Sequence, residues 1–136
     1  MSPAIVIRLL EPKEAVAYVE IRREALETVP LAFASSPEDD RGRSVDTVRQ
    51  SLADPENQVI VGAFDGERLV GIAGVGRYEK TKLRHRAIIW GMYVRRGARG
   101  LGLGRRLLEA AVQQAGAWPD VLQVHISVTD AAPEAR

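Results

Sequence analysis

The stretch VRRGARGLGLGRRLL, residues 94–108, decides how this chain is interpreted. After an apolar segment that ends at Val94, glycines stand at every second position among arginines, at Gly100, Gly102 and Gly104, and an apolar helical pattern follows. Glycine lets the backbone approach a ligand closely and turn its N–H groups inward. The start of a helix adds N–H donors without intrahelical partners and a partial positive charge. The pattern therefore predicts a loop that binds a phosphate or a pyrophosphate.

The spacing of the glycines excludes two common nucleotide-binding motifs. A P-loop requires Lys followed by Ser or Thr after its last glycine, whereas Arg105 and Arg106 follow Gly104 here. A dinucleotide-binding fingerprint requires G-x-G-x-x-G, and no third glycine stands at the required position. The alternative without a ligand is a glycine-rich turn between a core strand and a helix.

The spacing that fits is R-x-x-G-x-G, formed by Arg99, Gly102 and Gly104 after an apolar strand. It resembles the acyl-CoA pyrophosphate loop of the GNAT superfamily of N-acetyltransferases. The fuller family pattern, V-x-P-x-x-R-G-x-G-[IL]-G, is met except that Arg96 stands where proline is usual. The resemblance implies acetyl-CoA as co-substrate, bound by Met92, Tyr93, Val94, Arg99, Gly100, Leu101, Gly102, Leu103, Gly104 and Arg105.

Composition favours one ordinary globular domain over residues 1–136. The 136 residues are 46% hydrophobic and 27% charged, with a net charge of +1, so no overall charge favours nucleic acid. A nucleic-acid module built on the arginine cluster would also need stacking aromatics, yet only 5% of the residues are aromatic. Without cysteine and with two histidines, we expect no metal site. No apolar run is long enough to span a membrane, and the cytoplasm is the expected location.

Hydrophobic periodicity predicts an α/β protein of α+β-like character. Residues 58–64, 68–78 and 84–94 form an expected antiparallel meander, with a hairpin at Asp65-Gly66. A strand at 121–128 is expected to run parallel to 84–94, because a helix connects the two. The remaining expected elements are a strand at 5–9, helices at 12–27 and 44–52, a helix after the glycine loop that ends at 116–119, and the start of a helix at 129–136.

This order of elements is also that of the GNAT fold, a mixed, mostly antiparallel twisted sheet flanked by helices, with splayed central parallel strands. The family normally continues with an Asn-x-x-Ala-x-x-Leu-Tyr helix and two closing strands, whereas this sequence stops inside that helix, with Ala132 or, in a looser register, Asp130 at the asparagine position. We therefore expect a domain truncated at the C-terminus. A homodimer is the other way to cover the edge beside residues 121–128.

The resemblance implies that acetyl-CoA lies where strands 84–94 and 121–128 splay apart. Its pantetheine arm would pair with the backbone of Met92 and Val94, and a strand N–H near Met92 would polarise the thioester carbonyl. Gly91 is a candidate for the bulge that separates the strands, the alternative being a small residue opposite a bulky neighbour such as Trp90. Trp90 and Tyr93 could wall the acceptor pocket. One of them is expected in the core, because neighbours on a strand face opposite sides.

The sequence leaves the catalytic base open. The family's usual glutamate falls on Ile88, and the remaining candidates are Glu79 and His85, acting directly or through water, for which solvent exposure is the competing interpretation. An acidic run, residues 38–40, could attract a cationic amine or be a plain polar loop. Two functions therefore remain: an N-acetyltransferase acting on a primary amine of a small molecule or protein, or a non-catalytic acyl-CoA-binding module.

Overall fold

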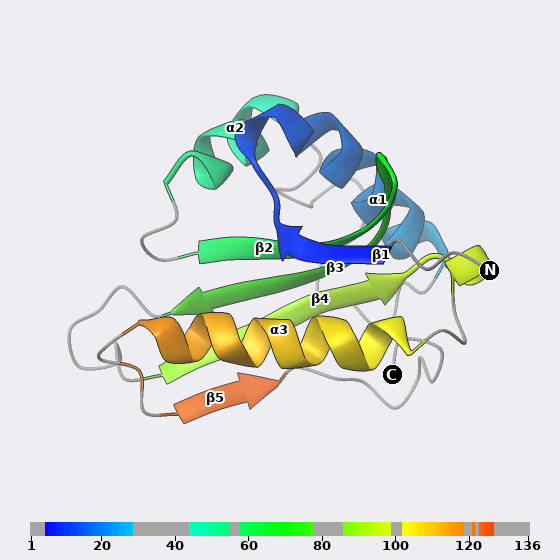
Figure 1. Cartoon of the computed structure of the whole chain (residues 1–136). Coiled ribbons are helices and arrows are strands. Elements are labelled where there is room, and N and C mark those ends of the chain that lie inside the picture. The colour runs from blue at the N-terminus through cyan, green and yellow to red at the C-terminus, as the bar shows by residue number, and fades with distance from the viewer. Residues whose placement is uncertain are drawn as a thin grey trace.

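The computed structural model describes residues 5–28, 44–54, 58–77, 86–98, 102–118, 121 and 123–126. Within them, one five-stranded sheet has the order β1-β2-β3-β4-β5 and carries helices on both faces (Figure 1). The strands are β1 (Ile5–Leu9), β2 (Gln58–Asp65), β3 (Arg68–Arg77), β4 (Arg86–Val94) and β5 (Gln123–Ile126). The helices are α1 (Ala15–Thr28), α2 (Val45–Leu52) and α3 (Leu103–Ala117), with 3-10 turns η1 (Pro12–Glu14) and η5 (Arg96–Ala98).

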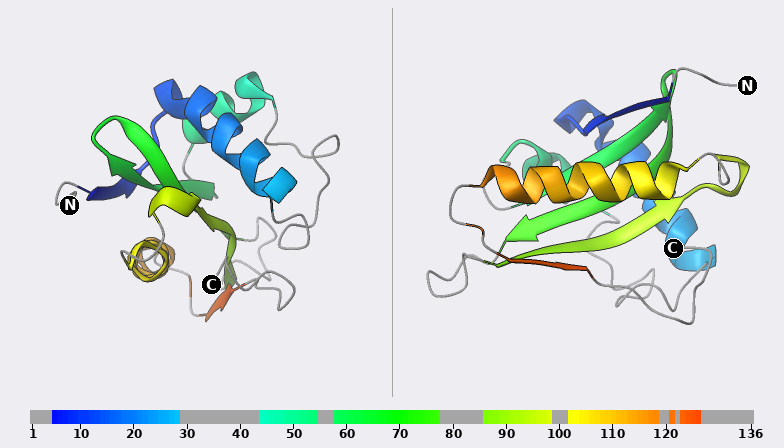
Figure 2. Two further views of the ribbon diagram at one scale, coloured as in Figure 1. Left: turned by 90° about the vertical axis from the view of Figure 1, so that its right-hand side faces the viewer. Right: turned by 60° about the horizontal axis from the view of Figure 1, so that its bottom comes forward.

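The meander β2-β3-β4 and the parallel pairing of β5 with β4 are as the sequence predicts, and β1 adds to the free edge of β2. Strands β1 to β4 are antiparallel neighbours, and β5 runs parallel to β4, with Arg86–Ile89 opposite Gln123–Ile126. The mixed sheet flanked by helices is therefore confirmed. Among the described strands the parallel pair lies at one edge of the sheet, and β4 and β5 diverge from their paired ends (Figure 2, right).

Each face of the sheet has its own core. Helices α1 and α2 cover one face and α3 covers the other, where it is seen end-on in Figure 2, left. The buried cluster under α1 and α2 contains aromatic side chains from both helix and sheet, including Tyr18, Phe64 and Tyr93. The buried residues under α3 are all aliphatic, among them Val61, Val75, Ile89, Leu103 and Leu107.

Local sequence signals place the helix ends. Ser44 caps α2, since its Oγ accepts a hydrogen bond from the Thr47 backbone N–H at 3.2 Å. The helix predicted at 12–27 begins with the 3-10 turn η1, where Glu11 and Glu14 form a capping box around Pro12. None of the helices in the described ranges is long and apolar enough to cross a membrane.

Candidate functional site

Strand β4 carries a bulge at the position that the sequence singles out. Trp90 lies opposite Gly74, while Tyr93 lies opposite Ile72, so two residues of β4, Gly91 and Met92, face one residue of β3. Gly91 has a φ of 62°, a backbone conformation that favours glycine and is typical of the first position of such a bulge. The expectation that Gly91 marks a bulge is confirmed.

The small residue opposite Trp90 is on the neighbouring strand instead. It is Gly74 of β3, where a Cβ atom would lie 2.5 Å from the indole ring. The bulge at Gly91 begins two residues after Ile89, which pairs with Ile126 in the parallel register. Because a bulge bends and twists its strand, it turns the end of β4 away from the direction set by that pairing.

The bulge also changes which way the aromatic side chains of β4 point. In a regular strand, side chains three residues apart face opposite sides. The extra residue cancels that alternation, so Trp90 and Tyr93 pack against the same cluster under α1, Tyr93 with only 2% of its surface exposed. The expectation that one of the two lies in the core is confirmed by Tyr93, but the reason given for it, that the two side chains face opposite sides, is wrong because it assumed an unbroken strand. Met92 and Val94 point the other way and pack under α3.

The predicted phosphate loop ends at an open helix start. Gly102 is the N-cap of α3, with φ 72° and ψ 17°, and it has no side chain that could accept from the first-turn amides. The first backbone bond of the helix runs from the Arg106 N–H to the Gly102 oxygen, at 3.1 Å. The amides of Leu103, Gly104 and Arg105 lie before that bond and have no carbonyl partner within the helix. A Cβ atom at Gly102 would meet no heavy atom of the described residues within 4 Å.

The structure brings part of the predicted cofactor set together. Met92, Val94 and Leu103 pack against the same aliphatic cluster, so the end of β4 and the start of α3 share one support. Gly104 and Arg105 follow in the first turn of α3. Three members of the set, Arg99, Gly100 and Leu101, lie outside the described residues.

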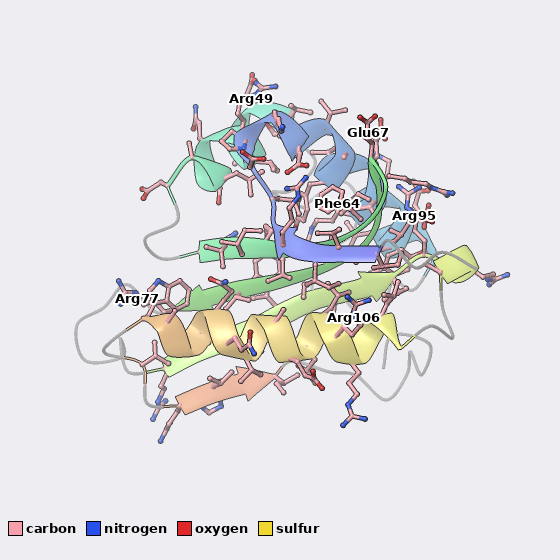
Figure 3. The ribbon with its side chains drawn as sticks, in the orientation of Figure 1. Arg49, Phe64, Glu67, Arg77, Arg95 and Arg106 are labelled. Atoms are coloured by element: carbon pink, nitrogen blue, oxygen red, sulfur yellow. The ribbon has the colours of Figure 1, made fainter. Side chains whose placement is uncertain are left out.

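The arginines around the loop do not all point toward it. Arg105 Nε donates to Glu109 Oε1 at 3.1 Å along its own helix, and Arg106 Nη2 donates to the Ile5 carbonyl oxygen at 3.3 Å. Arg95 points back toward α1 (Figure 3). The fixed positive charge that the sequence places at the loop is thus partly taken up by the protein itself.

A cluster of polar side chains that no sequence motif predicts lies between α1 and the end of β4. The buried hydroxyl of Tyr93 donates to Glu24 Oε2 at 2.7 Å, and Arg95 Nε lies 3.8 Å from Glu24 Oε1. Two residues before Glu24 on α1, Arg22 is only 9% exposed, donates to the Tyr18 hydroxyl at 3.2 Å and lies 5.2 Å from the Trp90 ring centre. The sequence offered one indication of this cluster: Arg22 stands next to Ile21 on the apolar side of the predicted helix, where a charged residue needs a partner.

The position where the resemblance implies a base holds a hydrocarbon side chain. Ala87 and Ile89 pack under α3, so Ile88 between them faces the α1 side. The candidates Glu79 and His85, and the acidic run at 38–40, lie outside the described residues.

Comparison with known proteins agrees with this geometry. Residues 14–135 match the sequence profile of the acetyltransferase (GNAT) family. The comparison with curated protein sequences finds no significant match. Among solved structures, an acetyltransferase of the GNAT family from Streptococcus pneumoniae is 23% identical, with a TM-score of 0.78, and the alignment covers 96% of this chain and 78% of that one.

Two further structures are similar in fold. A predicted acetyltransferase from Clostridium acetobutylicum, solved with acetyl-CoA, is 16% identical with a TM-score of 0.72, covering 96% of this chain and 85% of that one. A ribosomal-protein-alanine N-acetyltransferase from Brucella melitensis is 16% identical with a TM-score of 0.68, covering 98% of this chain and 86% of that one.

Proposed function

Because the chain belongs to the acetyltransferase (GNAT) family, we propose that it transfers the acetyl group of acetyl-CoA to a primary amine of a small molecule or protein. The family uses acetyl-CoA, and the Clostridium acetobutylicum relative was solved with it. The observation that supports a site in this chain is the start of α3, where Gly102 has no capping side chain and the amides of the first turn have no carbonyl partner within the helix. Such a helix start favours a pyrophosphate group.

The proposed binding residues follow the end of β4 and the loop into α3. Arg99 and the amides from Gly100 to Arg105, which include those of Leu101, Gly102, Leu103 and Gly104, would hold the pyrophosphate. The backbone of Met92, Tyr93 and Val94 would run along the pantetheine arm and pair with it at Met92 and Val94, where the bulge turns β4 away from β5. The buried Leu103 and Val94 fix both parts of this surface against the core.

Transfer of the acetyl group sets three tasks for the chain's own residues. The acceptor must lose a proton before its nitrogen can attack, the carbonyl oxygen needs a hydrogen-bond donor, and the departing thiolate needs a proton. Acetyl-CoA supplies the acetyl group as an activated thioester. The backbone N–H groups at the bulge, near Met92, are the proposed donors to the carbonyl oxygen.

Binding of acetyl-CoA is tested by unfolding the protein with and without the ligand. A ligand at 100 times its dissociation constant stabilises the native state by about 2.7 kcal/mol. Gly102→Glu is expected to abolish that stabilisation, because it places a carboxylate at the proposed pyrophosphate site. It should also cost about 1–2 kcal/mol without ligand, since a side chain is strained at a φ of 72°.

The matched control is Gly116→Glu, at the other end of the same helix. A Cβ atom at Gly116 also meets no heavy atom of the described residues within 4 Å, so this variant places the same charge on the same helix but away from the proposed pyrophosphate site. This variant should keep the full stabilisation by acetyl-CoA. Equal stabilisation of Gly102→Glu and Gly116→Glu would show that the loop is not the binding site.

Release of CoA in the presence of amines separates catalysis from binding alone. The acceptors should include polyamines, aminoglycosides and a peptide that begins with alanine, the last because of the activity named for the Brucella melitensis relative. Release with any of them supports the transferase. Stabilisation by acetyl-CoA without release from any amine would favour the non-catalytic acyl-CoA-binding module.

A further inference from the structure

We propose that Glu24 on α1 is the base that takes the proton of the acceptor amine, held in place by the buried hydroxyl of Tyr93. This inference rests on the acetyltransferase function proposed above. The family's usual base would stand at Ile88 on β4, facing α1. Glu24 lies on the same face of the sheet, but on α1 instead of on the strand.

The carboxylate of Glu24 is fixed on one side and open on the other. Tyr93, which is 2% exposed, donates to Oε2 at 2.7 Å, and the Arg95 guanidinium lies 3.8 Å from Oε1. The Glu24 side chain nevertheless keeps 39% of its surface exposed. A carboxylate has about four acceptor positions, so these two contacts leave room for an acceptor nitrogen.

The reach of Tyr93 places Glu24 at a useful distance from β4. Tyr93 directly follows the bulge, and its side chain spans the gap from the strand to the carboxylate. An attacking nitrogen lies about 3–3.5 Å from the thioester carbon and about 2.6–3.2 Å from the carboxylate oxygen that takes its proton. A thioester beside β4 and the Glu24 carboxylate can therefore be bridged by one nitrogen over roughly the length of a tyrosine side chain. One intervening water would extend that reach.

The proposed step balances in protons. The acceptor enters as an ammonium ion and gives one proton to Glu24, which makes its nitrogen a nucleophile. As the nitrogen–carbon bond forms and the carbon–sulfur bond breaks, a second nitrogen proton goes to the departing sulfur. Glu24 then releases its proton to solvent, so that the products are the amide, CoA with a free thiol, and one proton.

The charged and titratable groups near Glu24 determine which residues could contribute to the pH profile of kcat/KM. From the end of β4, Tyr93 and Arg95 contact the carboxylate, and they are its charged or titratable partners within the described part of the chain. On α1 itself, Arg22 lies against Tyr18 and Trp90, and Glu20 and Glu27 are exposed. Glu27 therefore provides a carboxylate on the same helix without the contact to Tyr93.

The experiment compares Glu24→Gln with Glu27→Gln, using an amine that the wild-type protein acetylates. Glu24→Gln should lower kcat/KM about 100-fold, in the range of general-base catalysis, and remove the acid-side inflection of its pH profile. With methoxyamine, which is already neutral at pH 7, the loss should be much smaller. Glu27→Gln should change none of these quantities.

Tyr93→Phe tests the positioning role separately. Losing the hydrogen bond should lower kcat/KM about tenfold for an amine that enters protonated and much less for methoxyamine, whereas a merely structural hydroxyl would lower both equally. Stabilisation by acetyl-CoA should equal that of the wild type in Glu24→Gln and Glu27→Gln, which shows that both are folded and bind the ligand, and thermal unfolding checks that Tyr93→Phe is folded.

Two failures are distinguishable. If the wild type acetylates an amine and Glu24→Gln keeps its kcat/KM and pH profile while still binding acetyl-CoA, the assignment of Glu24 is overturned and the proposed function stands. If the wild type binds no acetyl-CoA or acetylates no amine, the proposed function fails and the assignment of Glu24 fails with it.

Discussion

The two faces of the sheet are built from different chemistry. Under α3 the buried side chains are aliphatic, and the polar contacts of that helix lie outside this core: Arg105 bonds Glu109 on the same helix, and Arg106 bonds the Ile5 carbonyl oxygen on β1. Under α1 the core includes Tyr18 and Tyr93 and contacts the buried Arg22, and polar contacts reach the edge of the core at Glu24. Side chains without polar atoms pack without needing partners, whereas buried polar groups hold fixed hydrogen-bond geometry.

The two faces therefore have different roles: the α3 face supports the loop, and the α1 face carries the polar groups. The α3 face gives the loop at Gly102 a rigid aliphatic support, because Leu103 and Leu107 are almost completely buried one turn apart. The α1 face carries the hydroxyl, carboxylate and guanidinium groups that can recognise an acceptor and move a proton. Substitutions on the α3 face should therefore change stability most, and substitutions on the α1 face should change chemistry and pH dependence.

The largest expected effect on stability is that of Leu107→Ala. Leu107 is 0% exposed at the centre of the α3 cluster, and removing a buried leucine typically costs about 2–5 kcal/mol through lost burial and the cavity left behind. Urea denaturation would measure the loss. Val112→Ala on the same helix, where the side chain is 42% exposed, should stay within about 0.5 kcal/mol. Similar losses for both variants would contradict the role given to the α3 core.

A smaller effect is expected from adding one methyl group to each face of β3. At Gly74 a Cβ would meet the rigid indole of Trp90 at 2.5 Å, and at Gly71 it would meet the terminal Cδ1 of Leu107 at 2.9 Å. Overpacking costs about 1–3 kcal/mol, and a methyl group at the end of a flexible chain yields more easily than a ring. Gly74→Ala should thus destabilise the protein more than Gly71→Ala, as thermal unfolding would show. The reverse order would mean that the aromatic face is the more adaptable one.

The smallest effect is a pH dependence confined to the α1 side. A hydrogen bond from Arg8 lowers the pKa of Glu14 below its ordinary value, against an opposing contribution from burial. A lowered pKa stabilises the native state above the unfolded pKa of about 4.3, and this stabilisation disappears as the pH falls through the lower native value. Glu14→Gln should cost about 1 kcal/mol at pH 7 and flatten the loss of stability below pH 4.3.

The control for this prediction is Glu67→Gln, which removes one carboxylate from the exposed turn between β2 and β3. Its free energy of unfolding should follow the wild type over the same pH range. An acid-side slope that survives in Glu14→Gln would place the pH dependence of stability elsewhere in the molecule.

Much of the fold could be predicted because its signals are local. Ser44 caps α2, Gly66 forms the hairpin turn with a φ of 62°, and the alternation of apolar residues marks the strands. The bulge at Gly91 was also open to prediction, because a glycine inside a strand often marks one. The directions of Trp90 and Tyr93 were predicted wrongly, because a single added residue reverses the alternation beyond it.

The sequence by itself determined the order of the elements, the glycine-rich start of α3 and the absence of a glutamate at residue 88, since each depends on neighbouring residues in the chain. Only the tertiary structure decided that Glu24 meets Tyr93 and Arg95, some 70 residues later, and that Arg22 is buried against Trp90. Helical spacing fixes which side of α1 a residue occupies. It does not fix which strand packs beneath that side, because that contact is set by how the whole sheet folds against the helix.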